Sequence, residues 1–274
     1  MSKLYKPSVP SFATLIHWEG RKAWPDHAKT AWALDHKVTA YAFAEDLGLA
    51  IPRLSTEPMS FTSVPLRPGT VVKPLGGVMS TGVFLVQDSE IVDLGQNESL
   101  DTEQSVRSRM QELLDRGRVQ TDEWIVERLV RSDHDPSQPA RDLKFYCFYG
   151  TIGLMLETVR RPEVKRCWYS PDGARTKTGK YADELFGGFG IPDPYIEAAT
   201  RVSLEVPSPF VRVDFLASPE GPVFNEITPK PGGSHLLDRG WAIRLGNRFL
   251  AAARRLHEDL LGGRSFDVFL RHAG

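Results

Sequence analysis

Two successive β-rich segments, residues 209–216 and 222–228, carry charged side chains among valine and phenylalanine. Because side chains alternate along a strand, Arg212 and Asp214 are expected on one face, with Glu226 on the next strand. Charges in the middle of apolar strands are costly unless they pair or bind a metal. Carboxylates from neighbouring strands are oxygen ligands suited to a Mg²⁺ ion shared with substrate phosphates. The alternative is an Arg212–Asp214 or Arg212–Glu226 salt bridge in a half-exposed sheet.

A second segment places a lysine at the end of a strand, directly before a glycine-rich loop. Lys73 closes the run Val71-Val72-Lys73, and the loop that follows contains Gly76, Gly77, Ser80, Thr81 and Gly82. Glycines allow backbone N–H groups to converge on phosphate oxygens, and a lysine adds a positive charge. The lysine precedes the glycines, so this is not the G-x-x-x-x-G-K-[ST] phosphate loop. A hairpin turn with a solvated lysine explains the same pattern equally well.

Two further strands each carry a charged residue that could contribute to a site. Residues 124–130 place Glu127 at the centre of a short apolar strand whose backbone groups could face an adenine ring. An ordinary edge strand has the same pattern and is the favoured interpretation of this segment alone. Residues 141–150 place Lys144 on one strand face with Tyr146 and Phe148, and a lone lysine of this kind is usually solvated.

Hairpin strands flanked by helices would position these residues. The expected strands are Thr70–Lys73, Gly82–Val86, Glu123–Val130, Asp142–Tyr149, Thr151–Arg160, Pro209–Leu216 and Pro222–Thr228. The expected helices are Leu34–Leu47 with Asp35 as N-cap, Gln104–Asp115, a helix from Asp193, and Trp241–Leu261. Residues 1–25 are rich in proline and tryptophan, so we expect an irregular arm or substrate-side wall. The pattern predicts an α+β fold rather than a doubly wound parallel sheet.

The composition excludes several classes of protein. Lys and Arg number 34 against 35 Asp and Glu, a net charge of -1 that argues against nucleic-acid or polybasic membrane binding. The longest apolar runs fall far short of the about 20 residues of a membrane-spanning helix, and Met1–Lys6 leads into no apolar signal core. With only two cysteines, a disulfide framework is not expected. We therefore expect a soluble protein of a reducing compartment, the cytoplasm.

Taken in order, these segments resemble the ATP-grasp superfamily and, within it, the TupA-like ATP-grasp proteins, over about residues 35–250. The matching motifs are Asp35-x-Lys37 at a helix start, Val-Lys73-Pro with its glycine-rich loop, Val-Glu127-x-Leu129, Asp142-x-Lys144-Phe-x-x-Phe-x-Gly150, Phe-Val-Arg-Val-Asp214, and Glu226-Ile-Thr-x-x-Pro-Gly232. Each motif is weak alone, but their joint order and spacing are specific. The resemblance implies an ATP-grasp fold in which two α+β subdomains clamp the nucleotide.

The domain layout follows from this resemblance. Residues 1–60 would form a short N-terminal arm and helical region, in place of the larger N-terminal substrate domain of many members. Residues 61–140 would form the subdomain with the glycine-rich lid loop, and residues 141–274 the C-terminal subdomain with the metal site.

The resemblance also implies ATP and Mg²⁺ as cofactors and a role for each matching residue. The nucleotide-binding positions fall on Lys37, Lys73, Gly76, Gly77, Ser80, Thr81, Gly82, Glu127, Arg128, Leu129 and Lys144. Asp214 and Glu226 match the metal carboxylates. The catalytic positions are Lys144 and Arg212, which would stabilise the transferred phosphate or a tetrahedral intermediate. Lys230, Gly232 and His235 follow the metal strand and are candidate substrate contacts.

The sequence departs from the wider superfamily at Thr228, where many members carry asparagine two residues after the metal-binding glutamate. A hydroxyl is a poorer Mg²⁺ ligand than an amide oxygen, so the resemblance allows either one or two Mg²⁺ ions at this site.

The implied activity is an ATP-dependent ligase that joins a carboxylate to an amine through an acyl phosphate. Its substrates would be small molecules, peptides or glycans of polysaccharide or secondary-metabolite biosynthesis. One alternative is a kinase that phosphorylates a sugar or another hydroxyl acceptor on the same fold. Another is a nucleotide-binding module without catalysis, although binding alone does not need the metal pair.

Overall fold

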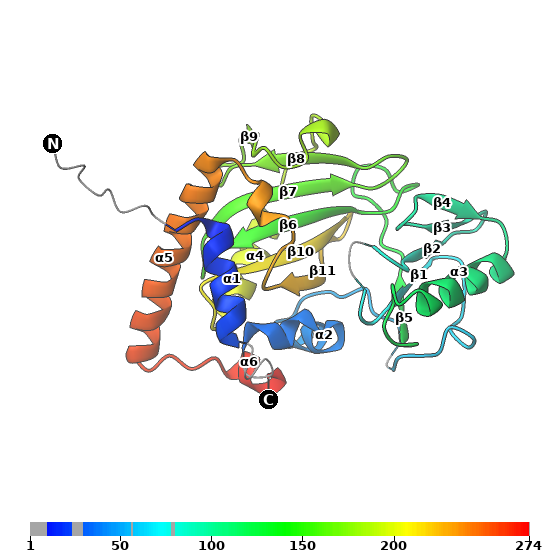
Figure 1. Ribbon diagram of the computed structural model, residues 1–274, viewed down its shortest axis with the longest axis horizontal. Coiled ribbons are helices and arrows are strands. Elements are labelled where there is room, and N and C mark those ends of the chain that lie inside the picture. The colour runs from blue at the N-terminus through cyan, green and yellow to red at the C-terminus, as the bar shows by residue number, and fades with distance from the viewer. Residues whose placement is uncertain (1–9, 24–29, 56, 78–79, 274) are drawn as a thin grey trace.

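The computed structural model describes residues 10–23, 30–55, 57–77 and 80–273. Within these ranges the chain builds two antiparallel sheets, each with its own helices (Figure 1). The smaller sheet lies at the right of Figure 1 and the larger sheet lies at its centre. This mixture of helices and antiparallel sheets confirms the predicted α+β class.

The smaller sheet has five strands in the order β4-β3-β2-β1-β5. They are β1 (Thr70–Pro74), β2 (Phe84–Val86), β3 (Ile91–Asp93), β4 (Glu98–Leu100) and β5 (Trp124–Arg128). Strands β1 and β2 form the predicted hairpin around the glycine-rich loop, with Thr70 opposite Val86. Helix α3 (Glu103–Asp115) begins after Thr102, whose side chain accepts the Ser105 N–H and so caps the first turn. The sheet and α3 bury a core around Phe84 and Trp124.

The larger sheet has six strands in the order β11-β10-β6-β7-β8-β9, all antiparallel to their neighbours. They are β6 (Arg141–Cys147), β7 (Ile152–Val159), β8 (Lys165–Tyr169), β9 (Arg175–Thr176), β10 (Val211–Ser218) and β11 (Gly221–Thr228). The predicted hairpins β6–β7 and β10–β11 are both present. In this order β10 lies between β6 and β11, which brings together segments about 70 residues apart.

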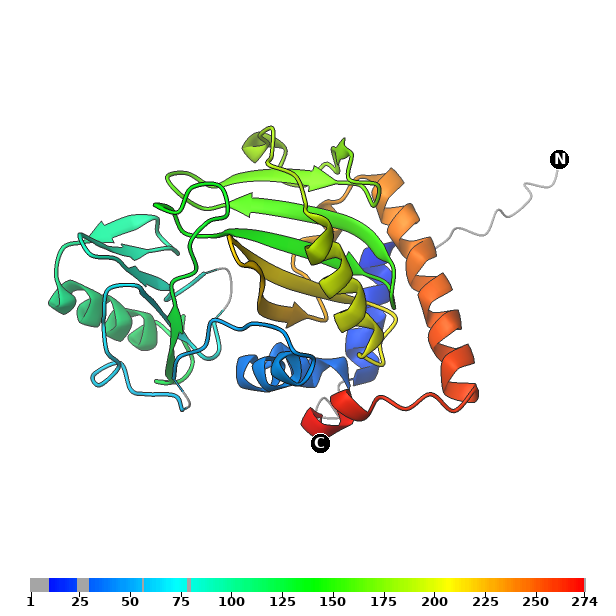
Figure 2. The ribbon, with the colours of Figure 1, turned by 180° about the vertical axis from the view of Figure 1, so that it is seen from behind.

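The strand alternation separates the two faces of the larger sheet. On one face, Asp214 lies directly opposite Glu226 on β11 and opposite Lys144 on β6. We call this the inner face; it carries Asp142, Lys144, Tyr146, Thr158, Arg166, Arg212, Asp214, Glu226 and Thr228. The opposite face is mainly apolar, apart from the buried ion pair of Arg141 and Glu157. Its Phe215 ring contacts Tyr195 of α4 (Asp193–Leu204). Figure 2 shows α4 running along this outer face.

The remaining helices lie at the edge and end of the larger sheet. Helix α2 (Lys37–Asp46) lies beside β11, and α5 (Arg239–Leu261) packs against α1 (Phe12–Ala23). Three short 3-10 helices complete the described fold together with the C-terminal α-helix α6 (Asp267–His272). They are η2 (Ala31–Asp35), η3 (Ala182–Glu184) and η4 (Ser234–Leu236). In the described part of the chain, no helix combines the length and the apolarity needed to cross a membrane.

The expectation that residues 1–25 are irregular is wrong for α1. Phe12, Leu15 and Ile16 are buried at helical spacing, and the Ser11 hydroxyl accepts the Thr14 N–H at the helix start. The Phe12 ring contacts Tyr146, so α1 packs over one end of the inner face. Residues 1–9 and 24–25 of that segment lie outside the described residues.

The predicted N-cap at Asp35 is also wrong. Asp35 ends η2, and His36 is the N-cap of α2 without a side-chain capping bond. The sequence analysis missed β3, β4, β8, β9 and α6, all of which are short. Segments of two to six residues show too few periods for a pattern to be recognised, and neighbouring strands determine their conformation.

Candidate functional site

Arg212 lies at the centre of an ion-pair network on the inner face. Its Nε and Nη2 donate to the two oxygens of Asp214 at 2.6 Å each, a forked pair. Nη2 also donates to Glu226 Oε1 at 2.8 Å and to Thr228 Oγ1 at 3.0 Å. Both salt bridges that the sequence offered as an alternative to a metal site are therefore present.

Two lysines extend this network from neighbouring elements. Lys144 Nζ on β6 lies 2.5 Å from Asp214 Oδ2, and Lys37 Nζ on α2 lies 3.5 Å from Glu226 Oε2. Lys144 is therefore paired rather than solvated. Three cations thus surround two carboxylates, which leaves a local excess of positive charge on the inner face.

Burial and these charges act in opposite directions on the two carboxyl groups. Burial raises the pKa of Asp214, and the charges of Arg212 and Lys144 oppose that rise. Burial would also raise the pKa of Glu226, but Lys37, Arg212 and Lys144 hold that pKa well below its usual value. Asp214 is fully buried, whereas the Glu226 side chain is 31% exposed. Glu226 is thus the more accessible charged carboxylate.

Lys73 on β1 forms a second buried polar cluster. Its Nζ lies 2.6 Å from Glu127 Oε1 on β5 and donates to the Tyr41 hydroxyl of α2 at 3.1 Å. Tyr41 in turn donates to Glu127. Lys73 is only 6% exposed, and burial lowers its pKa against the charge of Glu127. This cluster joins the smaller sheet to α2, which also carries Lys37.

The glycine-rich loop between β1 and β2 is described except for Val78 and Met79. A Cβ on Gly77 would lie 2.9 Å from Pro74, and a Cβ on Gly82 would lie 3.3 Å from Trp124. Gly82 also has a positive φ of 72°, so two of the loop glycines are required by close packing or by backbone conformation. Gly76 has open space around it.

In the strand predicted to face adenine, two backbone N–H groups already donate hydrogen bonds to other parts of the chain. Arg128 N–H donates to Pro52 O at 2.7 Å, and Leu129 N–H donates to Gly69 O at 2.8 Å. The Arg128 side chain is exposed and the Leu129 side chain is buried. These two N–H groups could bind a base only if they gave up their hydrogen bonds to Pro52 and Gly69.

The predicted substrate residues lie on the loop that follows β11. Lys230 Nζ and His17 Nδ1 of α1 are 3.2 Å apart, and His235 is exposed in η4. Gly232 O accepts a hydrogen bond of 2.6 Å from Lys180 Nζ, whose side chain is buried. The loop therefore lies between α1 and the Lys180 segment.

Sequence analysis assigned no role to four residues of this site: Tyr41, Asp142, Arg160 and Lys180. Asp142 precedes Lys144 by two residues, so the alternation rule could have placed it on the inner face. Arg160 Nε donates to Asp142 Oδ2 at 2.6 Å. Tyr41 and Lys180 carry no comparable signal, because tertiary packing alone brings them to the site.

The donor set can accommodate a divalent metal ion only with help from a ligand. Asp214 and Glu226 offer hard oxygen atoms suited to Mg²⁺. Across the described ranges, no group of three or more His, Cys, Asp or Glu side chains is arranged to hold a metal ion. The residues thus fit an ion that takes its other ligands from phosphate and water, as Mg²⁺ commonly does.

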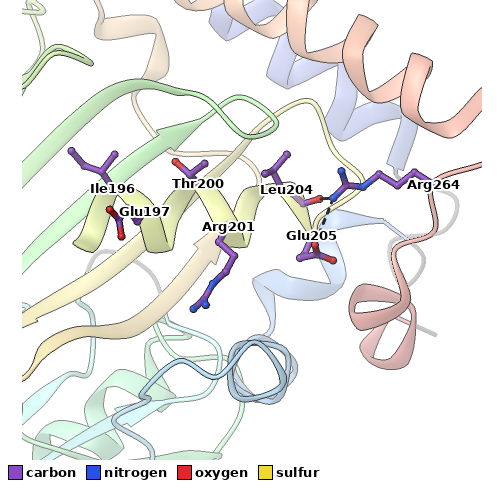
Figure 3. A pocket seen from close by; sticks show the side chains of 7 residues that line it. All are labelled: Ile196, Glu197, Thr200, Arg201, Leu204, Glu205 and Arg264. Atoms are coloured by element: carbon purple, nitrogen blue, oxygen red, sulfur yellow. Dashed lines mark hydrogen bonds and ion pairs between the residues drawn. The ribbon is translucent and has the colours of Figure 1, made fainter. Parts of the chain in front are cut away.

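A separate hollow of about 400 Å³ lies on the outer face of α4, away from this network (Figure 3). It is lined by Ile196, Glu197, Thr200, Arg201, Leu204, Glu205 and Arg264. Arg264 pairs with Glu205 at 3.6 Å. None of the predicted site residues lines this hollow.

Comparisons with known proteins show similarity both in sequence and in fold. A sequence model of the family described as TupA-like ATPgrasp matches residues 15–250. The structure is similar to D-alanine–D-alanine ligase from Bacillus anthracis, with a TM-score of 0.50 and 12% identity, covering 83% of this chain and 69% of that chain. D-cycloserine synthetase DcsG gives a TM-score of 0.48 at 19% identity, covering 82% of this chain and 71% of its own. A comparison with curated proteins found no match.

Proposed function

This chain belongs to the TupA-like ATP-grasp family, and on that premise we propose that it is an ATP- and Mg²⁺-dependent ligase that joins a carboxylate to an amine. The observation that carries the proposal is the row Glu226–Asp214–Lys144, aligned across three neighbouring strands. Arg212 donates hydrogen bonds to both carboxylates of this row. Such a row places metal ligands beside cations that can bind phosphate.

The residues of the chain divide into groups by what they can bind. Lys73, Lys144 and the N–H groups of the glycine-rich loop would hold the phosphates of ATP. Asp214 and Glu226 would hold Mg²⁺, which supplies positive charge to the phosphate oxygens when bound. Arg212 and Lys144 pair with these carboxylates, so their charges are compensated within the protein.

Arg212 would stabilise charge at the reacting centre. A substrate carboxylate oxygen attacks the γ-phosphorus and ADP leaves, which forms an acyl phosphate; an amine then attacks the acyl carbon and phosphate leaves. Negative charge develops on the phosphoryl oxygens in the first step and on the former carbonyl oxygen in the second. A guanidinium fixed by a fork to Asp214 needs little reorganisation to stabilise that charge.

The substrates would be small-molecule, peptide or glycan carboxylates and amines that enter near Lys230, Gly232 and His235. The position of α1 supports this, because His17 contacts Lys230 on that loop. Burial of Phe12 against Tyr146 closes the adjacent end of the inner face.

The test is a screen of carboxylates and amines for release of ADP and phosphate in the presence of Mg²⁺, with product identification by mass spectrometry. Ligation yields ADP, free phosphate and a joined product that is lost in Asp214→Asn. An acceptor that gains phosphate with no free phosphate released would identify a kinase instead. ATP binding without turnover of any substrate pair would favour a non-catalytic module.

A further inference from the structure

Arg160, the residue directly after β7, connects the two sheets at the site. Its Nε donates to Asp142 Oδ2 at 2.6 Å, and its Nη1 donates to Ser80 Oγ at 2.9 Å. Asp142 belongs to the inner face of the larger sheet, whereas Ser80 belongs to the glycine-rich loop of the smaller sheet. One guanidinium therefore links the inner face to the loop.

The charges around Arg160 place it beside the metal carboxylates. The Asp142 carboxylate raises the pKa of Arg160, burial opposes this, and Glu226 and Asp214 raise it further. Burial would raise the pKa of Asp142, but Arg160 and Lys144 lower it. The guanidinium thus lies within electrostatic reach of the carboxylates that would hold Mg²⁺.

The two partners of Arg160 differ in strength. Asp142 is buried and charged, so its hydrogen bond to Nε is a strong and lasting one. Ser80 offers a neutral hydroxyl from a residue with a φ of 62°, an unusual conformation for serine. In the described part of the chain Nη2 of Arg160 has no hydrogen-bond partner, and the side chain is 30% exposed. A phosphate oxygen is a better acceptor for this edge of the guanidinium than a hydroxyl.

We propose that Arg160 binds the terminal phosphates of the nucleotide, exchanging the Ser80 hydroxyl for a phosphate oxygen while Asp142 keeps the guanidinium in place. This inference rests on the proposed function, since it takes the inner face as the nucleotide site. Arg160 is then a phosphate-binding residue outside the motifs that carry the family resemblance. Asp142 is its positioning residue, and Ser80 occupies the phosphate position when no nucleotide is bound.

Calorimetric titration of the full chain with ATP, ADP and AMP, each with Mg²⁺, tests the role of Arg160. Arg160→Gln should weaken ATP binding at least tenfold and leave AMP binding within twofold. The matched control is Arg161→Gln, because Arg161 also joins the two sheets, but its partners Asn97 and Glu90 lie outside the inner face. This control should bind all three nucleotides as the wild type does. Equal losses for AMP and ATP in Arg160→Gln would overturn the proposal.

A double variant separates phosphate binding from a purely structural ion pair. Arg160→Gln alone leaves Asp142 buried and unpaired, which can lower the melting temperature. Arg160→Gln combined with Asp142→Asn removes both charges, so the melting temperature should return toward the wild-type value while ATP binding stays at least tenfold weaker. ATP affinity that returns together with stability would show that Arg160 acts only as a structural ion pair.

One further variant completes the test. If Arg160→Gln does not fold, Arg160→Lys keeps the charge without the fork and gives the same comparison. Absence of ATP binding by the wild type would refute the proposed function itself, whereas wild-type binding that Arg160→Gln retains would refute this inference alone.

Discussion

Lys144 Nζ lies 2.5 Å from Asp214 Oδ2, and the two residues are directly opposite each other on β6 and β10. Asp214 also accepts both bonds of the Arg212 fork. The carboxylate is therefore shared by two cations, Lys144 on the neighbouring strand β6 and Arg212 on β10 itself. Arg212 and Lys144 compensate its charge, against the opposing effects of burial and of the nearby Glu226.

This arrangement predicts that Asp214→Asn lowers stability in the absence of metal. Neutralising Asp214 leaves Lys144 and Arg212 with an excess of buried positive charge, at a cost of about 3–5 kcal/mol. Thermal unfolding without Mg²⁺ measures the change, and Asp115→Asn on the exposed end of α3 is the control. A melting temperature that rises in Asp214→Asn would show that carboxylate repulsion dominates. A large decrease with ATP turnover preserved would reduce this part of the site to a salt bridge.

Glu226→Gln should behave differently from Asp214→Asn. The Glu226 side chain is 31% exposed, so solvent screens its pairs with Arg212 and Lys37. Its charge still contributes to folding stability, because the neighbouring cations hold its pKa well below the usual value, so Glu226→Gln should lower the melting temperature, but less than Asp214→Asn does. We nevertheless expect loss of Mg²⁺-dependent ATP turnover, because Glu226 is the accessible metal carboxylate. Equal losses of stability in the two variants would contradict this separation.

The Lys73 cluster predicts that ATP binding and stability can be separated there as well. Lys73→Ala removes the cation that pairs with the buried Glu127, so both the melting temperature and ATP affinity should decrease. Lys73→Met combined with Glu127→Gln removes both charges and should recover stability but not ATP affinity. Titration calorimetry beside thermal unfolding measures both quantities. ATP affinity that is unchanged in Lys73→Ala would refute the phosphate-binding role of this lysine.

The glycine-rich loop predicts unequal effects of alanine at two glycines. Gly82→Ala places a Cβ against Trp124 and Pro74 at a positive φ, so it should cost on the order of 1–3 kcal/mol. In Gly76→Ala the added Cβ meets open space, so the free energy of unfolding should stay within about 0.5 kcal/mol of the wild-type value. Chemical denaturation of both variants checks the difference, and equal costs would contradict the packing described for Gly82.

The pairing of Asp46 with His272 and Arg271 predicts acid-sensitive docking of α6 on α2. Hydrogen bonds from His272 and Arg271 lower the pKa of Asp46 below its usual value of about 3.9. The contribution to stability is therefore complete above about pH 4 and is lost as the pH falls through the lowered pKa. Hydrogen exchange of residues 267–272 should increase below that pH, and in Asp46→Asn at neutral pH. Glu45→Gln, on the exposed neighbouring position, should not change it.

Periodicity within single segments was sufficient to predict much of this protein. The alternation of Val211, Arg212, Val213 and Asp214 predicts a strand with both charges on one face, because a strand has a repeat of two. The apolar stripe from Leu245 to Leu256 predicts the long helix α5 in the same way. The order and spacing of the motifs predicted the ATP-grasp family and its α+β fold. These features depend on neighbours in sequence, which the sequence contains directly.

Only the tertiary structure decided which charges meet. Tyr41 and Glu127 are 86 positions apart, Lys144 and Asp214 are 70 apart, and Arg160 and Ser80 are 80 apart. Their contacts depend on the strand order β11-β10-β6-β7 and on the position of α2 beside β11. Local conformational propensity does not specify such pairings. The free energy that selects them comes from burial of the shared core and from compensation of buried charge. The same physics makes α1 a helix in a segment rich in proline and tryptophan, because Phe12, Leu15 and Ile16 bury their side chains only when α1 packs on the sheet and α5.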